Sequence, residues 1–89
     1  MMAQFTVVIP LYNKAAEIRA TLDSVFAQVF TDFQVIVIDD GSTDQSAALV
    51  KSYNDVRLRL ITQKNQGVGP ARNKGVQEAQ TPYIAFLDA

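Results

Sequence analysis

The sequence predicts an α/β protein in which a mostly parallel sheet lies between two layers of helices. Short apolar runs alternate along the chain with segments whose apolar residues recur at helical spacing, and this order is typical of consecutive βαβ units. Three of the apolar runs also lack polar alternation, as strands covered on both faces do. The chain is therefore expected to fold in three layers: helix, sheet and helix.

Four segments are predicted as strands. Residues 5–9 (FTVVI), 34–38 (QVIVI) and 83–87 (YIAFL) are expected to be buried on both faces. Residues 57–61 (RLRLI) alternate polar and apolar side chains, which indicates an edge strand or a half-covered strand. Pro10 is expected to end the first strand, because proline has no N–H to donate to a neighbouring strand.

Three helices are predicted between the strands, because apolar residues recur there every three or four positions. In the first helix these residues are Ile18, Leu22, Val25, Phe26 and Val29. In the second, which Ser42 and Gln45 open at capping-box spacing, they are Leu49, Val50 and Tyr53. In the third, with Pro70 in its first turn, they are Val68, Ala71, Gly75, Val76 and Ala79. Glycine inside a helix costs about 1 kcal/mol relative to alanine, so a close approach of helix to sheet is expected at Gly75.

The composition excludes several kinds of function. The chain has 89 residues, enough for one small domain, and its net charge of -1 with no basic tract argues against nucleic acid as a partner. It has no cysteine and no histidine, so thiolate and imidazole metal ligands and His-based triads are excluded within it. No apolar run approaches the ~20 residues of a membrane span, and the first residues lack the pattern of a signal peptide. We therefore expect a cytoplasmic protein.

Polar residues follow three of the predicted strands, at Pro10 to Asn13, at Asp39-Asp40 and at Asp88. Ligands of open parallel sheets bind outside the carboxyl ends of the strands, so these residues are expected to gather at one edge. Adjacent carboxylates at the end of a buried strand repel each other, which favours a functional role for Asp40 over a purely structural one. The polar residues that follow are interpreted as caps of the next helix: Ser42, Thr43 and Asp44.

The segment KNQGVGPARNKG at residues 64–75 is a glycine-containing loop that opens a helix. Helix N-termini favour anions, and the first turn disfavours a cation such as Arg72. Arg72 therefore indicates an anionic partner, which is Asp40, Asp88 or a ligand phosphate, with a solvated surface arginine as the alternative. Tyr12 offers a ring on which a base could stack, although its position alone favours neither this nor a surface role.

Taken together, these segments resemble the family 2 glycosyltransferases of the GT-A fold. The resemblance rests on VVIPLYNKAAEI (7–18), SVFAQVFTDFQVIVIDDGSTD (24–44), NQGVGPARNKGV (65–76) and YIAFLDA (83–89). These four segments occur in the family's order and at its spacing, so the resemblance extends along essentially the whole chain.

The resemblance implies a nucleotide-sugar donor, most often a UDP-sugar, whose sugar is transferred with inversion. It implies that Pro10 and Tyr12 line the pocket for base and ribose, that Asp40 hydrogen-bonds the base, and that Arg72 lies near the nucleotide. Asp88 begins an aspartate element that, in the family, contacts the ribose and holds a divalent metal, Mg²⁺ or Mn²⁺.

The sequence departs from the family pattern after Asp88-Ala89. The later aspartates of the metal element, the downstream general base and the acceptor-binding region do not follow. Residues 1–89 are therefore expected to be the N-terminal nucleotide-sugar-binding part of a longer Rossmann-like domain, truncated after the fourth strand and inactive alone. The full-length protein is expected to use the metal and a glycan or lipid-linked acceptor, and peripheral association with the cytoplasmic membrane face is compatible with this.

Three other readings stay open. A signalling receiver domain also has strand-end aspartates, but its acidic pair follows the first strand and here the pair follows the second. A sugar nucleotidyltransferase needs a glycine-rich, basic loop after the first strand, which PLYNKAAE is not. A non-catalytic module that self-associates through an exposed sheet edge is the third.

Overall fold

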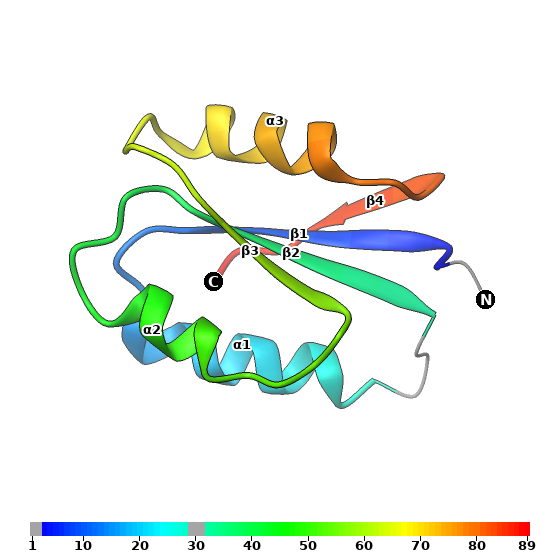
Figure 1. Ribbon diagram of the computed structural model, residues 1–89, viewed down its shortest axis with the longest axis horizontal. Coiled ribbons are helices and arrows are strands. Elements are labelled where there is room, and N and C mark those ends of the chain that lie inside the picture. The colour runs from blue at the N-terminus through cyan, green and yellow to red at the C-terminus, as the bar shows by residue number, and fades with distance from the viewer. Residues whose placement is uncertain (1–2, 29–31) are drawn as a thin grey trace.

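In the part of the chain that the structure describes, four parallel strands form a single sheet in the order β3 (Leu58–Thr62), β2 (Phe33–Asp39), β1 (Phe5–Leu11) and β4 (Tyr83–Phe86) (Figure 1). The structure is a computed structural model that describes residues 3–28 and 32–89. Its elements, in chain order, are β1 (Phe5–Leu11), α1 (Ala15–Phe26), β2 (Phe33–Asp39), α2 (Ser46–Lys51), β3 (Leu58–Thr62), α3 (Val68–Glu78) and β4 (Tyr83–Phe86). Val29, which is predicted to lie on the first helix, falls outside the described residues.

The sheet lies between two helical layers, with α1 and α2 on one face and α3 on the other (Figure 1). Side chains of successive residues point to opposite faces of a strand, and the buried residues divide accordingly. The α1–α2 side of the core contains Val7, Ile9, Leu11, Ile18, Leu22, Val25, Phe33, Val35, Val37 and Val50. The α3 side contains Val8, Ile36, Ile38 and Ala71. The three-layer fold predicted from the sequence is confirmed.

The two central strands, β1 and β2, are almost completely buried, and β3 is half-buried, as predicted. The prediction that the fourth strand is buried on both faces is wrong. Tyr83 is 68% exposed and Phe86 is 49% exposed, because β4 lies at the edge of the sheet, where the helices of the described residues cover little of it. Ile84 is the β4 residue that packs against the α3 side of the core.

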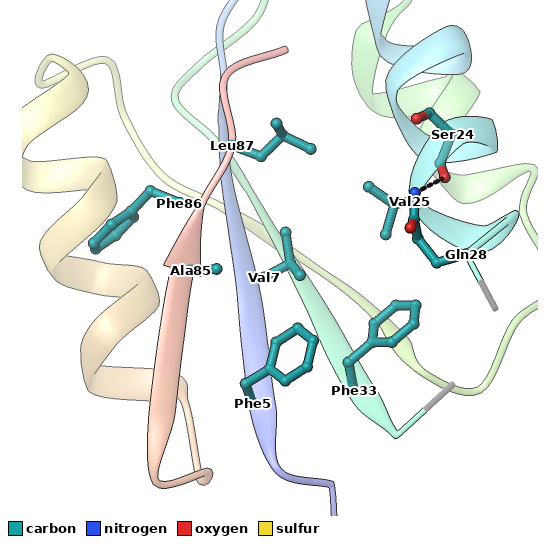
Figure 2. Close-up of a pocket in the computed structure, with 9 residues that line it drawn as sticks. All are labelled: Phe5, Val7, Ser24, Val25, Gln28, Phe33, Ala85, Phe86 and Leu87. Carbon is teal, nitrogen blue, oxygen red and sulfur yellow. Dashed lines mark hydrogen bonds between the residues drawn. The ribbon is translucent and has the colours of Figure 1, made fainter. Parts of the chain in front are cut away.

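An apolar groove of about 410 Å³ runs between α1 and β4 (Figure 2). Ser24 and Val25 border it on α1, Gln28 borders it just past the end of that helix, and Ala85 and Leu87 lie across from them (Figure 2). None of its lining residues is ionisable, so it offers no acid–base chemistry. None of the helices in the described ranges combines the length and apolarity needed to cross a membrane.

Pro10 does not end the first strand, which continues to Leu11 with Pro10 opposite Ile38. The Asp40 N–H donates to the Leu11 carbonyl on the β2 side, and the Leu87 N–H donates to the Val8 carbonyl on the β4 side. Alternate residues of β1 therefore turn their backbone groups to opposite neighbours, and Pro10 turns toward β4. Proline has no N–H to donate to the segment after Phe86, so the pairing of β1 with β4 stops at Val8, while the pairing of β1 with β2 is unaffected and continues to Leu11.

Two of the helices differ from their predictions in detail. The second begins at Ser46, and Ser42 lies before it without capping it. In α3 the small residues Ala71 and Gly75 are buried, whereas Val68 and Val76, predicted on the same inner face, are exposed. Alanine and glycine let the helix axis approach the sheet, so a stripe of small residues faces β1 and β2 and the valines lie to its sides.

The close approach expected at Gly75 is confirmed and gives a test of how α3 packs. A Cβ built on Gly75 would lie 3.0 Å from Val8 Cγ2 and closer still to Cγ1. Gly75→Ala is therefore expected to lower the free energy of unfolding by about 1–3 kcal/mol, because overpacking outweighs the gain in helix propensity. Gly69→Ala is the matched control in the same helix, since its Cβ would meet no atom within 4 Å. Urea denaturation measures both, and a Gly75→Ala chain as stable as the control would contradict this packing.

Candidate functional site

A polar groove of about 720 Å³ lies at the carboxyl edge of the sheet, where the segments after all four strands meet. Its lining residues are Pro10, Leu11, Tyr12, Lys14, Asp40, Asn65, Gly67, Val68, Arg72, Asp88 and Ala89. All five residues predicted as site residues are among them, although they come from four different parts of the chain. Lys14 and Asn65 were not predicted as site residues, because neither follows a strand directly, although both lie in segments that carry the family resemblance.

The Asp40 carboxylate lies at the end of β2 and connects that end to the loop between β3 and α3. Its Oδ1 accepts hydrogen bonds from Gln63 Nε2 at 2.9 Å and from the Gln66 N–H at 2.8 Å. Its Oδ2 accepts one from the Gly67 N–H at 2.9 Å, and Asn65 Nδ2 donates to the Asp40 carbonyl at 3.2 Å. The side chain is thus held from the side of the loop while it borders the groove.

These hydrogen bonds decide the charge of Asp40. Burial on its own raises the pKa of this carboxyl group, but the hydrogen bonds from Gln63, Gln66 and Gly67 outweigh burial and lower the pKa below its ordinary value of 3.8. Asp40 is therefore an anion at neutral pH, with acceptor oxygens and no proton to donate.

The neighbouring Asp39 has a different task. Its side chain turns away from the loop that Asp40 holds, and its Oδ1 accepts the Ser42 N–H at 3.0 Å, which closes the turn after β2. Gly41 follows with φ of +78°, and a Cβ there would lie 2.8 Å from the Asn65 backbone nitrogen. The turn therefore needs glycine at this position, and the two carboxylates avoid each other by facing different partners.

Asn13 joins the segment after β1 to the segment after β2. Its backbone is left-handed, with φ of +50°, a conformation that asparagine tolerates better than most residues. Its Oδ1 accepts the Thr43 N–H at 2.7 Å and the Asp44 N–H at 3.3 Å, and its own N–H donates to Ser42 Oγ at 3.0 Å. The predicted capping roles of Ser42 and Thr43 are therefore wrong, because both residues bind Asn13 and not the start of α2.

Asp44 and Ser46 extend this connection to two helix starts. Asp44 Oδ1 accepts the Ser46 N–H at 2.9 Å at the start of α2, while Oδ2 accepts the Ala15 N–H at 3.2 Å at the start of α1. Ser46 Oγ in turn accepts the Lys14 N–H at 2.9 Å. Hydrogen bonds from Ser46 and from the Ala15 N–H lower the pKa of Asp44. Asp44 therefore accepts an N–H at the start of both α1 and α2, as a capping side chain does, although the N-cap residues themselves are Lys14 and Gln45.

Arg72 is the fifth residue of α3, just past the first turn where it was predicted. Its Nη2 lies 3.3 Å from Asp88 Oδ1, and its guanidinium carbon lies 5.9 Å from the centre of the Phe86 ring. The anionic partner is thus Asp88, one of the predicted alternatives. Within the described residues, Arg72 Nε is buried and has no hydrogen-bond partner.

The groove does not provide a complete metal site. The Asp88 side chain is 78% exposed and can bind a cation, but the Asp40 oxygens already accept three hydrogen bonds. Within residues 3–28 and 32–89 there is no group of three or more side chains that could hold a metal ion. The residues present therefore fit one ligand of a divalent metal and not a full coordination shell.

A ligand for this groove can be described by its chemistry. The Tyr12 ring is 46% exposed and offers a flat apolar face, and Asp40 offers a fixed negative acceptor nearby. Lys14 and Arg72 add two positive charges to the lining, which favour an anionic group such as a phosphate. A covered parallel sheet with such a groove at its carboxyl edge is typical of proteins that bind nucleotides.

Comparison of the chain with known proteins supports a nucleotide-binding fold and identifies its family. The profile of the family described as Glycosyl transferase family 2 matches residues 6–89. The chain belongs to this family of glycosyltransferases. The uncharacterized glycosyltransferase YibD of Escherichia coli (strain K12) is 41% identical to it over 88 residues, which cover 97% of the chain and 26% of YibD.

Two solved structures share the fold along nearly all of the chain. S. aureus TarS 1-349 in complex with UDP-GlcNAc superimposes with a TM-score of 0.91 and 34% identity, over 96% of this chain and 26% of that one. The mannosyltransferase PcManGT from Pyrobaculum calidifontis, in complex with GDP-Man and Mn²⁺, superimposes with a TM-score of 0.89 and 26% identity, over 99% and 28%. The chain thus spans about a quarter of the length of these relatives.

The connection through Asn13 can be tested by stability. Asn13→Gly keeps the left-handed backbone but removes the acceptor of two N–H groups, so the free energy of unfolding should fall by about 1–2 kcal/mol. Asn13→Asp keeps an acceptor oxygen and should lose less. Chemical denaturation of the two variants makes the comparison, and equal losses would show that the Oδ1 contacts add nothing.

Proposed function

We propose that this chain is the nucleotide-binding part of a longer inverting glycosyltransferase that takes its sugar from a UDP-sugar. The observation that carries the proposal is the groove itself, where segments after four strands bring together an aromatic face, an ionised carboxylate and two cations. The complex of TarS with UDP-GlcNAc supports a uridine nucleotide, since TarS shares this fold at 34% identity.

In this proposal Tyr12, Pro10 and Asp40 bind the nucleoside. The exposed Tyr12 ring stacks against the base, and Pro10 completes the wall on the same segment. The Asp40 anion accepts the imide N–H of the base, which a protonated carboxyl group would do poorly. The hydrogen bonds that lower the pKa of Asp40 therefore also keep it suited to this contact.

The diphosphate lies toward the two cations. Lys14 and Arg72 both line the groove, and their positive charges favour the phosphate oxygens. Asp88 contacts the ribose and supplies one oxygen ligand to Mg²⁺ or Mn²⁺, whose remaining ligands come from outside this groove. The Mn²⁺ in the PcManGT complex supports this use of a divalent metal.

Transfer with inversion is a single displacement. The acceptor hydroxyl oxygen bonds to the anomeric carbon as the bond from that carbon to UDP breaks, and a general base takes the hydroxyl proton. Neither carboxylate of the groove is suited to be this base, because Asp40 is held by three donors and Asp88 is paired with Arg72. We therefore expect the chain to bind the donor and not to transfer the sugar. The acceptor, a glycan or a lipid-linked sugar, is bound by another part of the longer protein. That protein is expected to lie in the cytoplasm.

The contribution of Tyr12 tests nucleotide binding. Tyr12→Ala is expected to weaken UDP binding by roughly tenfold, because stacking of a base on an aromatic ring contributes about 1–3 kcal/mol. Tyr83→Ala is the matched control, since Tyr83 is also exposed but does not line the groove. Isothermal titration with UDP gives the dissociation constants. Equal constants for wild type and Tyr12→Ala, or no binding at all, would overturn this assignment.

The unpaired edge of β4 favours a second behaviour, self-association. Within the described residues β4 pairs with β1 only, and the apolar groove beside it is open. An exposed strand edge next to an apolar surface invites pairing with another chain. Size-exclusion chromatography at two concentrations tests this, and a monomer at both would count against it.

A further inference from the structure

The hydrogen bonds around Asp40 leave little room for a ligand. A carboxylate has about four lone-pair positions, two on each oxygen. Gln63 Nε2 and the Gln66 N–H fill those of Oδ1, and the Gly67 N–H fills one of Oδ2. One acceptor position on Oδ2 therefore remains at the groove.

Bases differ in how many donors they bring to such a carboxylate. Uracil presents one imide N–H between two carbonyl oxygens. Guanine presents two adjacent donors, which match both oxygens of an open carboxylate in the way a forked donor does. A carboxylate with a single open position satisfies uracil and leaves one guanine donor unpaired, and a buried unpaired donor is costly.

Gln63 is the side chain that occupies the acceptor position on Asp40 Oδ1 that a second guanine donor would need. Its backbone N–H donates to the Asp39 carbonyl at 2.9 Å, which fixes it just beyond the end of β3. From there its amide reaches Asp40 Oδ1, yet Gln63 itself does not line the groove. The other two donors to Asp40 are backbone groups and do not depend on residue type, so Gln63 is the replaceable one.

We propose that Gln63 is a positioning residue that sets the base preference of the groove, favouring uracil over guanine by occupying Asp40 Oδ1. The proposal rests on the nucleotide-binding function given above and extends it to a residue that does not contact the ligand. Asn65, whose amide donates to the Asp40 carbonyl, does not add to this preference, because uracil and guanine both place a carbonyl oxygen beside the N–H that faces Asp40.

The test compares the dissociation constants of UDP and GDP for the full chain by isothermal titration. The two ligands share their ribose and diphosphate, so the ratio of constants isolates the base. Wild type is expected to bind UDP more tightly. Gln63→Met keeps the length of the side chain without its donor and should reduce the preference by roughly threefold to tenfold, about the effect of one hydrogen bond.

Two further variants separate base selection from a general structural effect. Gln66→Ala keeps the backbone N–H that reaches Asp40 and should leave the ratio unchanged. Gln63→Lys keeps a donor beside Asp40 and should retain the wild-type preference. Gln63→Ala also removes the donor and serves as the second test if methionine does not fit at this position.

Each other outcome has a distinct meaning. If UDP binds but Gln63→Met and Gln63→Ala both keep the wild-type ratio, the role of Gln63 is overturned while the nucleotide-binding function stands. Wild type that binds GDP as tightly as UDP also overturns it. A chain that binds neither nucleotide contradicts the proposed function itself.

Discussion

The Asp40 carboxylate is the point at which the carboxyl edge of this small sheet is held together. It is almost fully buried and charged, a combination that would be costly without partners, and three donors from the β3–α3 loop supply them. In return, the loop that opens α3 is fixed against the end of β2. The groove depends on this connection, because it holds the loop with Gly67, and the start of α3 that follows it, at the strand ends.

A second set of hydrogen bonds fixes the segment after β1, which carries Tyr12, relative to Asp40. Asn13 and Asp44 tie the segment after β1 to the segment after β2, so the loop that carries Tyr12 is set relative to Asp40. Tyr12 and Asp40 are 28 positions apart in the sequence, and their relation is fixed by the backbone hydrogen bond from the Asp40 N–H to the Leu11 carbonyl together with these side chain-to-backbone hydrogen bonds. The polar residues of the edge therefore divide into those that build the loops and those that remain open to a ligand.

Much of the fold was predictable because periodicity reports burial directly. The four parallel strands, the three helices and the gathering of Pro10, Tyr12, Asp40, Arg72 and Asp88 at one edge follow from the strand order and the βαβ rule. The exposure of β4 was not predictable, because an apolar run indicates that a strand can be covered and not what covers it. The prediction that Pro10 ends the first strand was wrong, because the effect of a proline within a strand depends on which neighbouring strand its nitrogen faces.

The supporting residues of the site were beyond reach of the sequence for another reason. Gln63 and Asn13 act through hydrogen bonds that span 23 to 31 positions and depend on loop geometry. Glutamine and asparagine are not diagnostic of such roles by themselves. The spacing of Ser42 and Gln45 fitted a capping box equally well, although Ser42 accepts the Asn13 N–H in the structure. The sequence offered only a weak signal at position 13, namely that asparagine is among the few residues that readily adopt the left-handed backbone seen there.

A crystal structure of the chain with UDP would test the central claim most directly, because it measures where the base lies relative to Asp40. We expect the uracil N3 to lie about 3 Å from Asp40 Oδ2, with Gln63 still bound to Oδ1 and the base against the Tyr12 ring. UDP bound outside the groove, or with its base turned away from Asp40, would contradict the account.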